Sequence, residues 1–278
     1  ISVTAADAAG NTATVVSTAN ADFTAPVLTV NPVAGDGYVS IAEAAGPIAI
    51  TGTASLSEAG RTVSVTLNGE TYTGTVQPNG QWSITVPAGA LSAVADGQYP
   101  LRVEISDAAG NSTTVTSTVQ LDGNPATAPT LTLNTFAGNN VVDGAEQQTA
   151  QILSGTTTQV EAGQTVTVTL NNVTYTATVQ TGGNWSVSIP SADLLALQNG
   201  SLTLAATVSD KAGNPASGTT NLTVDNTLSG LSVEPLTGDN LLNAAEAAAG
   251  VTLTGTSTNV PVNGVVTLTL NGKTYTGT

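Results

Sequence analysis

Apolar and hydroxyl-bearing residues alternate along short stretches of this chain. In Thr62-Val-Ser-Val-Thr-Leu67 every second residue is apolar. Because side chains point alternately to the two faces of a β-strand, this pattern predicts a strand with one buried face. Asn68-Gly69 follows directly, and this dipeptide favours a type I′ turn, which needs positive φ at both central positions. The pattern therefore predicts a β-hairpin whose second strand runs through 72–76.

The same period of two recurs between turn residues elsewhere. Further strands are predicted at 27–30, 48–53, 82–86, 101–105 and 115–121. Seven short strands in about 100 residues, separated by Gly, Asn and Pro, are typical of an immunoglobulin-like β-sandwich. The disulfide of antibody domains is missing, because the chain contains no Cys. We therefore expect an all-β fold.

A motif of the form Asp-x-Ala-Gly-Asn occurs three times, at 7–11, 107–111 and 210–214, with spacings of 100 and 103 residues. A period of this size corresponds to a whole domain rather than to a solenoid unit. We expect tandem immunoglobulin-like β-sandwich domains in an extended array, excerpted from a longer protein. The expected units are the end of one repeat at 1–22, complete repeats at 23–122 and 123–225, and the front half of another at 226–278.

Acidic residues dominate the charge of the chain. Nineteen Asp and Glu residues against four Lys and Arg residues give a formal net charge of −15. Nucleic acids and anionic membrane surfaces are bound through Lys and Arg, so neither is an expected partner, and the apolar runs are too short for membrane insertion. The absence of His and Cys excludes a Ser-His-Asp triad, a Cys nucleophile and a thiolate zinc site. We therefore do not expect an enzyme.

Several motifs together resemble one protein family. Val-Thr-Leu-Asn-Gly-x-Thr-Tyr-Thr, Gly-Gln-Trp-Ser and Ser-Asp-x-Ala-Gly-Asn resemble the bacterial Ig-like repeats of giant non-fimbrial adhesins and biofilm-associated proteins, which are exported by type I secretion. The resemblance implies a secreted or cell-surface stalk, loaded with calcium, that supports cell adhesion, biofilm formation or virulence. It implies neighbouring repeats as partners, a receptor bound by another part of the parent protein, and a monomeric chain.

Ig topology gathers the recurring acidic residues at the ends of the repeats. The loop between the last two strands faces the preceding repeat, whereas the first interstrand loop and the end of the last strand face the following one. Between the second and third repeats, the expected metal ligands are Asp36, Glu43, Asp122 and Asp210, with Glu161 as a further candidate. The preceding junction offers Asp22 and Asp107, with Glu58 as a candidate, and the next offers Asn139, Asp143, Glu146 and Asp225.

Carboxylates that converge within a few ångströms repel one another unless a cation lies among them. Calcium suits such sites better than magnesium, because it accepts six to eight oxygen ligands in irregular geometry. The alternative for each acidic residue is a local role. An Asp before Ala-Gly-Asn can simply bond its own turn, and Asp143 can cap a short helical turn together with Glu146. For any single residue both interpretations stay open.

Two tryptophans allow a different functional interpretation. Trp82 and Trp185 could be sugar-stacking platforms, which would make the repeats themselves a glycan- or matrix-binding module. Each Trp shares its strand face with two aliphatic residues, so a core position is favoured for both. The leading hypothesis is a stalk segment stiffened by calcium at the junctions between repeats, and the binding module is the alternative.

Overall fold

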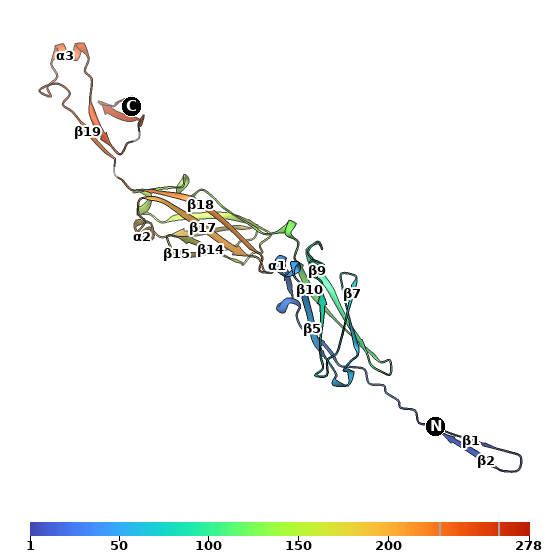
Figure 1. Cartoon of the computed structure of the whole chain (residues 1–278). Helices are drawn as coiled ribbons and strands as arrows, with labels where there is room; N and C mark the ends of the chain where they lie inside the picture. Colours follow the sequence, from blue (N-terminus) through green and yellow to red (C-terminus); the bar gives the residue numbers. More distant parts are fainter. Residues whose placement is uncertain (228, 261) are drawn as a thin grey trace. The chain divides into compact units, whose positions relative to one another are not determined.

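The structure is a computed structural model that describes residues 1–227, 229–260 and 262–278. The chain folds into two compact units. The first unit comprises 1–130, 158–164 and 208–216, and the second comprises 131–157, 165–207 and 217–278. Strands predominate throughout (Figure 1). The expected all-β fold is confirmed.

Two sheets form the sandwich of the first unit. The smaller sheet has the order β3 (Leu28–Val30), β5 (Ile48–Ala54), β8 (Gln81–Val86). The larger has the order β4 (Tyr38–Ser40), β10 (Ser112–Asp122), β9 (Gly97–Ser106), β6 (Thr62–Leu67), β7 (Glu70–Thr75). Only the β4–β10 pair is parallel among the pairs described for these two sheets. Each of the seven predicted strands is present.

The sandwich contains elements that the pattern does not predict. β4 has three residues, too few to display a period, and Ser40 lies opposite Asp122 of β10. The helix α1 (Ile41–Ala45) starts directly afterwards with a capping box, in which Ser40 and Glu43 exchange side-chain and backbone hydrogen bonds. Short 3-10 turns occur at η1 (Val33–Gly35) and η2 (Leu56–Glu58). Within described residues 28–122 there are thus eight strands rather than seven.

The following repeat has the same architecture. Its smaller sheet has the order β11 (Thr130–Leu133), β13 (Gln151–Thr158), β16 (Asn184–Ile189). Its larger sheet has the order β12 (Val141–Asp143), β18 (Pro215–Asp225), β17 (Gly200–Ser209), β14 (Thr165–Leu170), β15 (Val173–Thr178). Its short helical elements are η3 (Pro125–Thr127), η4 (Phe136–Gly138), η5 (Glu146–Gln148) and α2 (Ser191–Leu195). The recurrence of strand order confirms tandem Ig-like domains.

The inward faces of the strands form the core as the alternation predicts. Val63 and Val65 are 0% exposed, while the Thr residues beside them remain on the outer face. In the turn after β6, Asn68 has φ 50° and Gly69 has φ 81°, as a type I′ turn requires. The equivalent turn after β14 uses Asn171 and Asn172, with φ of 48° and 64°, because Asn tolerates the left-handed region.

Each sandwich is closed by a tryptophan packed on a glycine. Trp82 is 1% and Trp185 is 2% exposed, so the predicted core position of both is confirmed. A Cβ built on Gly52 would lie 2.1 Å from the carbonyl oxygen of Thr29 and 2.5 Å from Cζ2 of Trp82. The indole therefore occupies the space that any larger residue on β5 would need.

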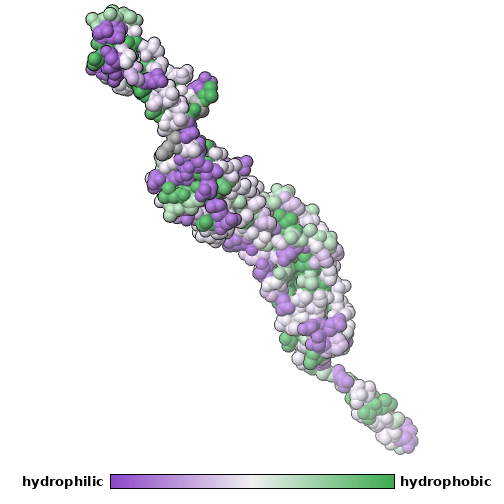
Figure 2. Space-filling view, turned by 60° about the vertical axis from the view of Figure 1, so that its left-hand side comes forward, coloured by the Kyte–Doolittle hydropathy of each residue, from purple (hydrophilic) through white to green (hydrophobic). Residues whose placement is uncertain are grey.

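The remaining elements lie near the two ends of the chain. They are β1 (Ser2–Ala6), β2 (Thr12–Val16), β19 (Gly230–Val233), α3 (Ala244–Ala249), β20 (Gly255–Thr258), β21 (Val266–Leu270) and β22 (Lys273–Gly277). Apolar side chains stay exposed there, for example Val3 at 64% and Leu231 at 66%. On the face shown in Figure 2, hydrophobic residues form small groups among hydrophilic ones. In the part of the chain described, no helix is long and apolar enough to cross a membrane.

Candidate functional site

The recurring Asp-x-Ala-Gly-Asn loops form closed turns. In the third copy, Asp210 accepts hydrogen bonds from the backbone N–H of Asn214 at 2.8 Å and from its Nδ2 at 2.9 Å. In the second copy, Asp107 accepts the same pair of bonds from Asn111, at 2.8 Å and 2.7 Å. The amide of Asn111 holds the pKa of Asp107 below its usual range. The local role of these aspartates is therefore present in the structure.

The same Asn side chains also reach segments much earlier in the chain, between 89 and 173 residues away. Asn214, which is 2% exposed, donates from Nδ2 to the carbonyl oxygen of Asp122 at 2.9 Å, and its Oδ1 accepts the N–H of Ile41 at 2.7 Å. Asn111 makes the equivalent bond to the carbonyl oxygen of Asp22 at 3.1 Å. All of these residues belong to the first unit. In the third copy, the loop motif thus binds the end of β10, the last strand of the preceding repeat.

Carboxylates gather beside this contact. A cleft of about 400 Å³ in the first unit is lined by Asp96, Asp122 and Glu161, together with Gly97, Gln120, Gln159 and Val160. We name it the acidic cleft. Burial, and the charges of Asp210, Asp96 and Glu161, raise the pKa of Asp122 to about 6. The structure therefore brings the predicted residues Asp122, Asp210 and Glu161 to one place, where the neighbouring charges disfavour the ionised form of Asp122.

Asp96 also lines this acidic cleft, and no pattern in the sequence predicts it there. It accepts the N–H of Asn124 at 3.2 Å and the hydroxyl of Thr127, so it holds the segment that follows β10. In the next repeat, Asn199 accepts the N–H of Asn226 at 3.1 Å in the same manner. The signal for this role is an Asx-Gly dipeptide before β9 and again before β17, 103 residues apart.

Replacing Asp96 with alanine is expected to free the segment after β10. Hydrogen bonds to a carboxylate contribute about 1.5–3 kcal/mol, so amide hydrogen exchange at Asn124 should become at least about tenfold faster. Asp96→Asn is the matched control, because it keeps an acceptor oxygen, as Asn199 does naturally. Unchanged exchange at Asn124 in the alanine variant would show that Asp96 does not hold this segment.

The other predicted ligands have local partners. Asp36 accepts the N–H of Tyr38 at 2.9 Å, and Glu43 closes the capping box of α1. Asn139 accepts the N–H of Val141 at 2.8 Å. The structure does not bring Asp36 or Asn139 to another of the predicted ligands through any hydrogen bond described.

At the end of the following repeat, Asp143 and Asp225 lie opposite each other on the parallel strands β12 and β18. Asp143 accepts the N–H groups of Ala145 and Glu146, each at 2.8 Å, and Glu146 accepts the N–H of Asp143 at 3.1 Å. These bonds cap the turn before η5, as the alternative interpretation allows. Hydrogen bonds from Thr227 lower the pKa of Asp225.

These residues suit a cation by the type of their donor atoms, but their side chains do not lie close enough together to hold one. The donors are carboxylate and amide oxygens, the ligands that calcium prefers. Among the described residues, however, no three His, Cys, Asp or Glu side chains are grouped closely enough to hold a metal ion. A calcium ion in the acidic cleft would therefore need its carboxylates to move closer together.

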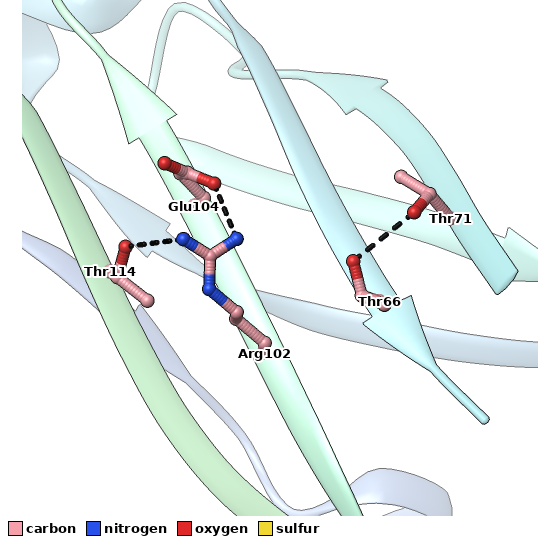
Figure 3. A network of polar contacts seen from close by, with 5 residues as sticks. All are labelled: Thr66, Thr71, Arg102, Glu104 and Thr114. Atoms are coloured by element: carbon pink, nitrogen blue, oxygen red, sulfur yellow. Dashed lines mark hydrogen bonds and ion pairs between the residues drawn. The ribbon is translucent and has the colours of Figure 1, made fainter. Parts of the chain in front are cut away.

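Among the described residues, no ion pair joins a basic side chain to the carboxylates of the acidic cleft. The ion pair of the described residues joins Arg102 to Glu104 at 2.6 Å on the outer face of β9. Arg102 also donates to the Thr114 hydroxyl at 3.3 Å, and Thr66 bonds Thr71 in the neighbouring strands (Figure 3). Lys211 contacts Glu161 through its backbone N–H, at 3.0 Å.

Comparisons with known proteins identify close relatives of these repeats. The chain matches the bacterial Ig-like domain family over residues 49–123 and 125–226. It is 38% identical to a Ca2+-stabilized adhesin that helps an Antarctic bacterium bind ice, over 99% of this chain and 69% of that one, with a TM-score of 0.43. It is 33% identical to a 1.5-MDa bacterial ice-binding adhesin, over 93% and 84%, with a TM-score of 0.43.

A single bacterial Ig-like domain of the M. primoryensis ice-binding adhesin is 41% identical over 36% of this chain and 99% of that one, with a TM-score of 0.28. A comparison with curated proteins gives no match. The relatives are surface adhesins built from Ig-like repeats rather than enzymes, and the expected secreted, cell-surface location agrees with them. By the family match and these sequence identities, the chain belongs to the bacterial Ig-like domain family, as a tandem segment similar to the repeats of large adhesins.

Proposed function

We propose that this chain is a stalk segment of a bacterial surface adhesin, in which calcium bound where successive repeats meet limits hinge motion. The acidic cleft is the site that carries the proposal, with Asp96, Asp122 and Glu161 as ligands and Asp210 beside them. The observation that supports it is the raised pKa of Asp122, which burial and three neighbouring carboxylates cause. A divalent cation would supply the missing positive charge.

The remaining predicted ligands extend the proposal along the repeat. By position in the sequence, Asp22 and Asp107 serve the junction before the acidic cleft, and Asn139, Asp143, Glu146 and Asp225 serve the one after it. By position in the sequence, Asp36 and Glu43 belong to the same junction as the acidic cleft. With the proposed repeat boundaries of 23–122 and 123–225, the ligands at the acidic cleft come from two repeats, as do Asp22 and Asp107 at the junction before it.

An ion with ligands from two repeats stiffens the link between them, because bending would break oxygen–calcium contacts. At low free calcium inside a cell the carboxylates repel one another, and the link stays loose. Outside the cell, calcium would hold successive repeats in one arrangement. This difference would suit export of a loose chain followed by stiffening at the cell surface, where the stalk supports adhesion or biofilm formation.

Calcium is expected to narrow the range of conformations of the whole chain in solution. Small-angle scattering should give a longer, more sharply defined distance distribution in calcium than in EGTA. Asp122→Asn combined with Asp210→Asn should remove the response, since two of the four carboxylates are then neutral. Glu70→Gln, on the edge strand β7, is the matched control and should respond as the parent chain does.

Identical scattering profiles in calcium and in EGTA would contradict calcium stiffening. A response that persists in the double variant would place the ion elsewhere in the chain. Sedimentation in both buffers should give the mass of a monomer, as we propose for a stalk whose receptor is bound by another part of the parent protein.

The burial of the indoles weighs against the alternative function, in which the two tryptophans stack on sugars. Trp82 and Trp185 are 1% and 2% exposed, so neither ring face is available to stack on a sugar at the surface. The stalk role is therefore the function that the described geometry supports best.

A further inference from the structure

A second cleft lies in the second unit and has a different character from the acidic cleft. It has a volume of about 610 Å³ and is lined by residues of β13, β14, β15 and β16. That volume falls within the range of small-molecule sites, about 300–1,000 Å³. It contains none of the proposed calcium ligands, so a proposal about this cleft can be tested independently of the calcium proposal. We name it the polar cleft.

The lining of the polar cleft carries no charged side chain, although the chain has a net charge of −15. Amide groups and hydroxyl groups predominate instead, and they include Asn134, Thr176, Gln180, Asn184 and Ser186. An anion would find no basic partner here and a metal cation would find no carboxylate. The lining matches a neutral ligand with many hydroxyl groups, which both donate and accept hydrogen bonds.

Part of the hydrogen-bonding capacity of this lining is unused. Asn134 donates from Nδ2 to Ser154 at 3.0 Å, and Gln180 donates from Nε2 to the carbonyl oxygen of Thr178 at 3.0 Å. Both bonds leave the amide oxygens available as acceptors. The side-chain amide of Asn184 has no hydrogen-bond partner among the described residues. Donors and acceptors thus remain free along the wall of the polar cleft.

The indole of Trp185 lies beside this wall of the polar cleft. Its Nε1, like that of Trp82, is buried and has no hydrogen-bond partner among the described residues. The edge of the ring that bears this nitrogen lies over Gly155, since Cε2 and Cζ2 are the side-chain atoms nearest to an added Cβ there. Trp185 and Gly155 both line the polar cleft, so the buried indole lies beside any ligand held there and its N–H signal can report on binding.

The preceding repeat shows how the spacing of the strands affects this surface. At Gly74 of β7, an added Cβ would lie 2.9 Å from the carbonyl oxygen of Ser83 and 2.8 Å from Cγ1 of Ile84. The equivalent residue of β15 is Ala177, which lines the polar cleft and whose methyl group needs more room beside β16 than a glycine would. Ala177 therefore helps to keep the polar cleft open.

We propose that the polar cleft binds a neutral saccharide, with Asn184, Gln180 and Asn134 bonding its hydroxyl groups beside the buried indole of Trp185. The buried indole lies beside the ligand and does not stack on it. It goes beyond the stalk function, since it assigns a ligand to the repeat itself.

The two tryptophans of the chain provide a direct test by NMR. The ¹⁵N-labelled chain is titrated with the methyl pyranosides of glucose, galactose and N-acetylglucosamine, and the two indole N–H signals are followed. For at least one of these saccharides, we expect a saturable shift of the Trp185 signal with a Kd on the order of 1 mM, while the Trp82 signal stays in place. The trisaccharide of that sugar is a second arm, and tighter binding than the monosaccharide identifies a glycan chain as the source.

Asn184→Ala should weaken the binding at least about fivefold, the effect of one lost hydrogen bond. Gln81→Ala is the matched control, because Gln81 occupies the equivalent position in the preceding repeat, and it should leave the Trp185 shift unchanged. Ala177→Gly should reduce the shift by letting β15 approach β16. The proposal is overturned if no saccharide of the panel shifts the Trp185 signal, if Trp82 shifts equally, or if a folded Asn184→Ala chain binds as before.

Discussion

Replacing Gly155 with alanine is expected to lower the free energy of unfolding of the second unit by at least about 3 kcal/mol, at the upper end of overpacking effects. The added methyl group would lie 1.9 Å from the carbonyl oxygen of Thr132 and 2.6 Å from Cζ2 of Trp185. Neither neighbour can retreat, because one is strand backbone and the other is a ring enclosed in the core. Urea unfolding followed by tryptophan fluorescence would measure the loss.

The same substitution at Gly52 should destabilise the first unit to a similar extent, since its added Cβ would lie 2.5 Å from Cζ2 of Trp82. Gly144→Ala is the control in the second unit, because a Cβ there meets no atom closer than 3.9 Å. A Gly155→Ala chain with an unchanged unfolding midpoint would contradict the account of how the indole packs. A Gly155→Ala chain whose tryptophan fluorescence changes more on unfolding, at the same midpoint, would also contradict that account, because the ring would then have moved without loss of stability.

Replacing Asp122 with asparagine is expected to have opposite effects in EGTA and in calcium. Without calcium at pH 7, the variant should be more stable than the parent by about 1–2 kcal/mol, which allows for solvent screening of a partly exposed group. With free calcium at a hundred times its Kd, the parent should gain about 2.7 kcal/mol from binding, and the variant much less. Thermal melts of both chains in both buffers would show whether their order reverses.

The pH dependence of stability is a second measurement of the unfavourable charge on Asp122. The folded pKa of Asp122, about 6, lies above its ordinary value of 3.8, so folding favours the protonated form. The stability that this protonated form contributes is fully present below pH 3.8. It is lost as the pH rises to 6, and remains lost above that value. In EGTA the parent should therefore lose stability across this window and Asp122→Asn should not.

Parallel pH profiles of the two chains in EGTA would show that Asp122 is not strained by its neighbours. An equal gain from calcium in both chains would remove Asp122 from the set of ligands while leaving its raised pKa intact. The two readouts thus separate the electrostatic argument from the metal assignment.

Alternation of apolar and polar residues was sufficient to predict the strands, because a sandwich strand has one face in the core and one in water. Val63 and Val65 illustrate this, and Asn68-Gly69 specified its turn through local backbone preference alone. Strand β4 escaped prediction because three residues carry no period. Its position is determined by parallel pairing with β10, a contact about 80 residues distant in the sequence.

The acidic cleft was likewise predicted in part by the sequence and in part decided by tertiary packing. The sequence placed Asp122 and Asp210 in recurring series, and the expected Ig topology suggested that they meet. Asp96 could not be found in this way, since its bonds to Asn124 and Thr127 depend on how the loop before β9 lies beside the end of β10. The amount by which Asp122 is buried, and hence its raised pKa, also arises only from that packing.

By itself, the sequence determined the all-β class, the domain-sized period, the strand faces and the membership of the bacterial Ig-like family, because each depends on local pattern or on recurrence along the chain. The tertiary structure alone decided that Trp82 and Trp185 fill the core against Gly52 and Gly155, and which carboxylates share the acidic cleft. Those properties depend on distances between residues far apart in sequence, and a linear pattern does not contain such distances.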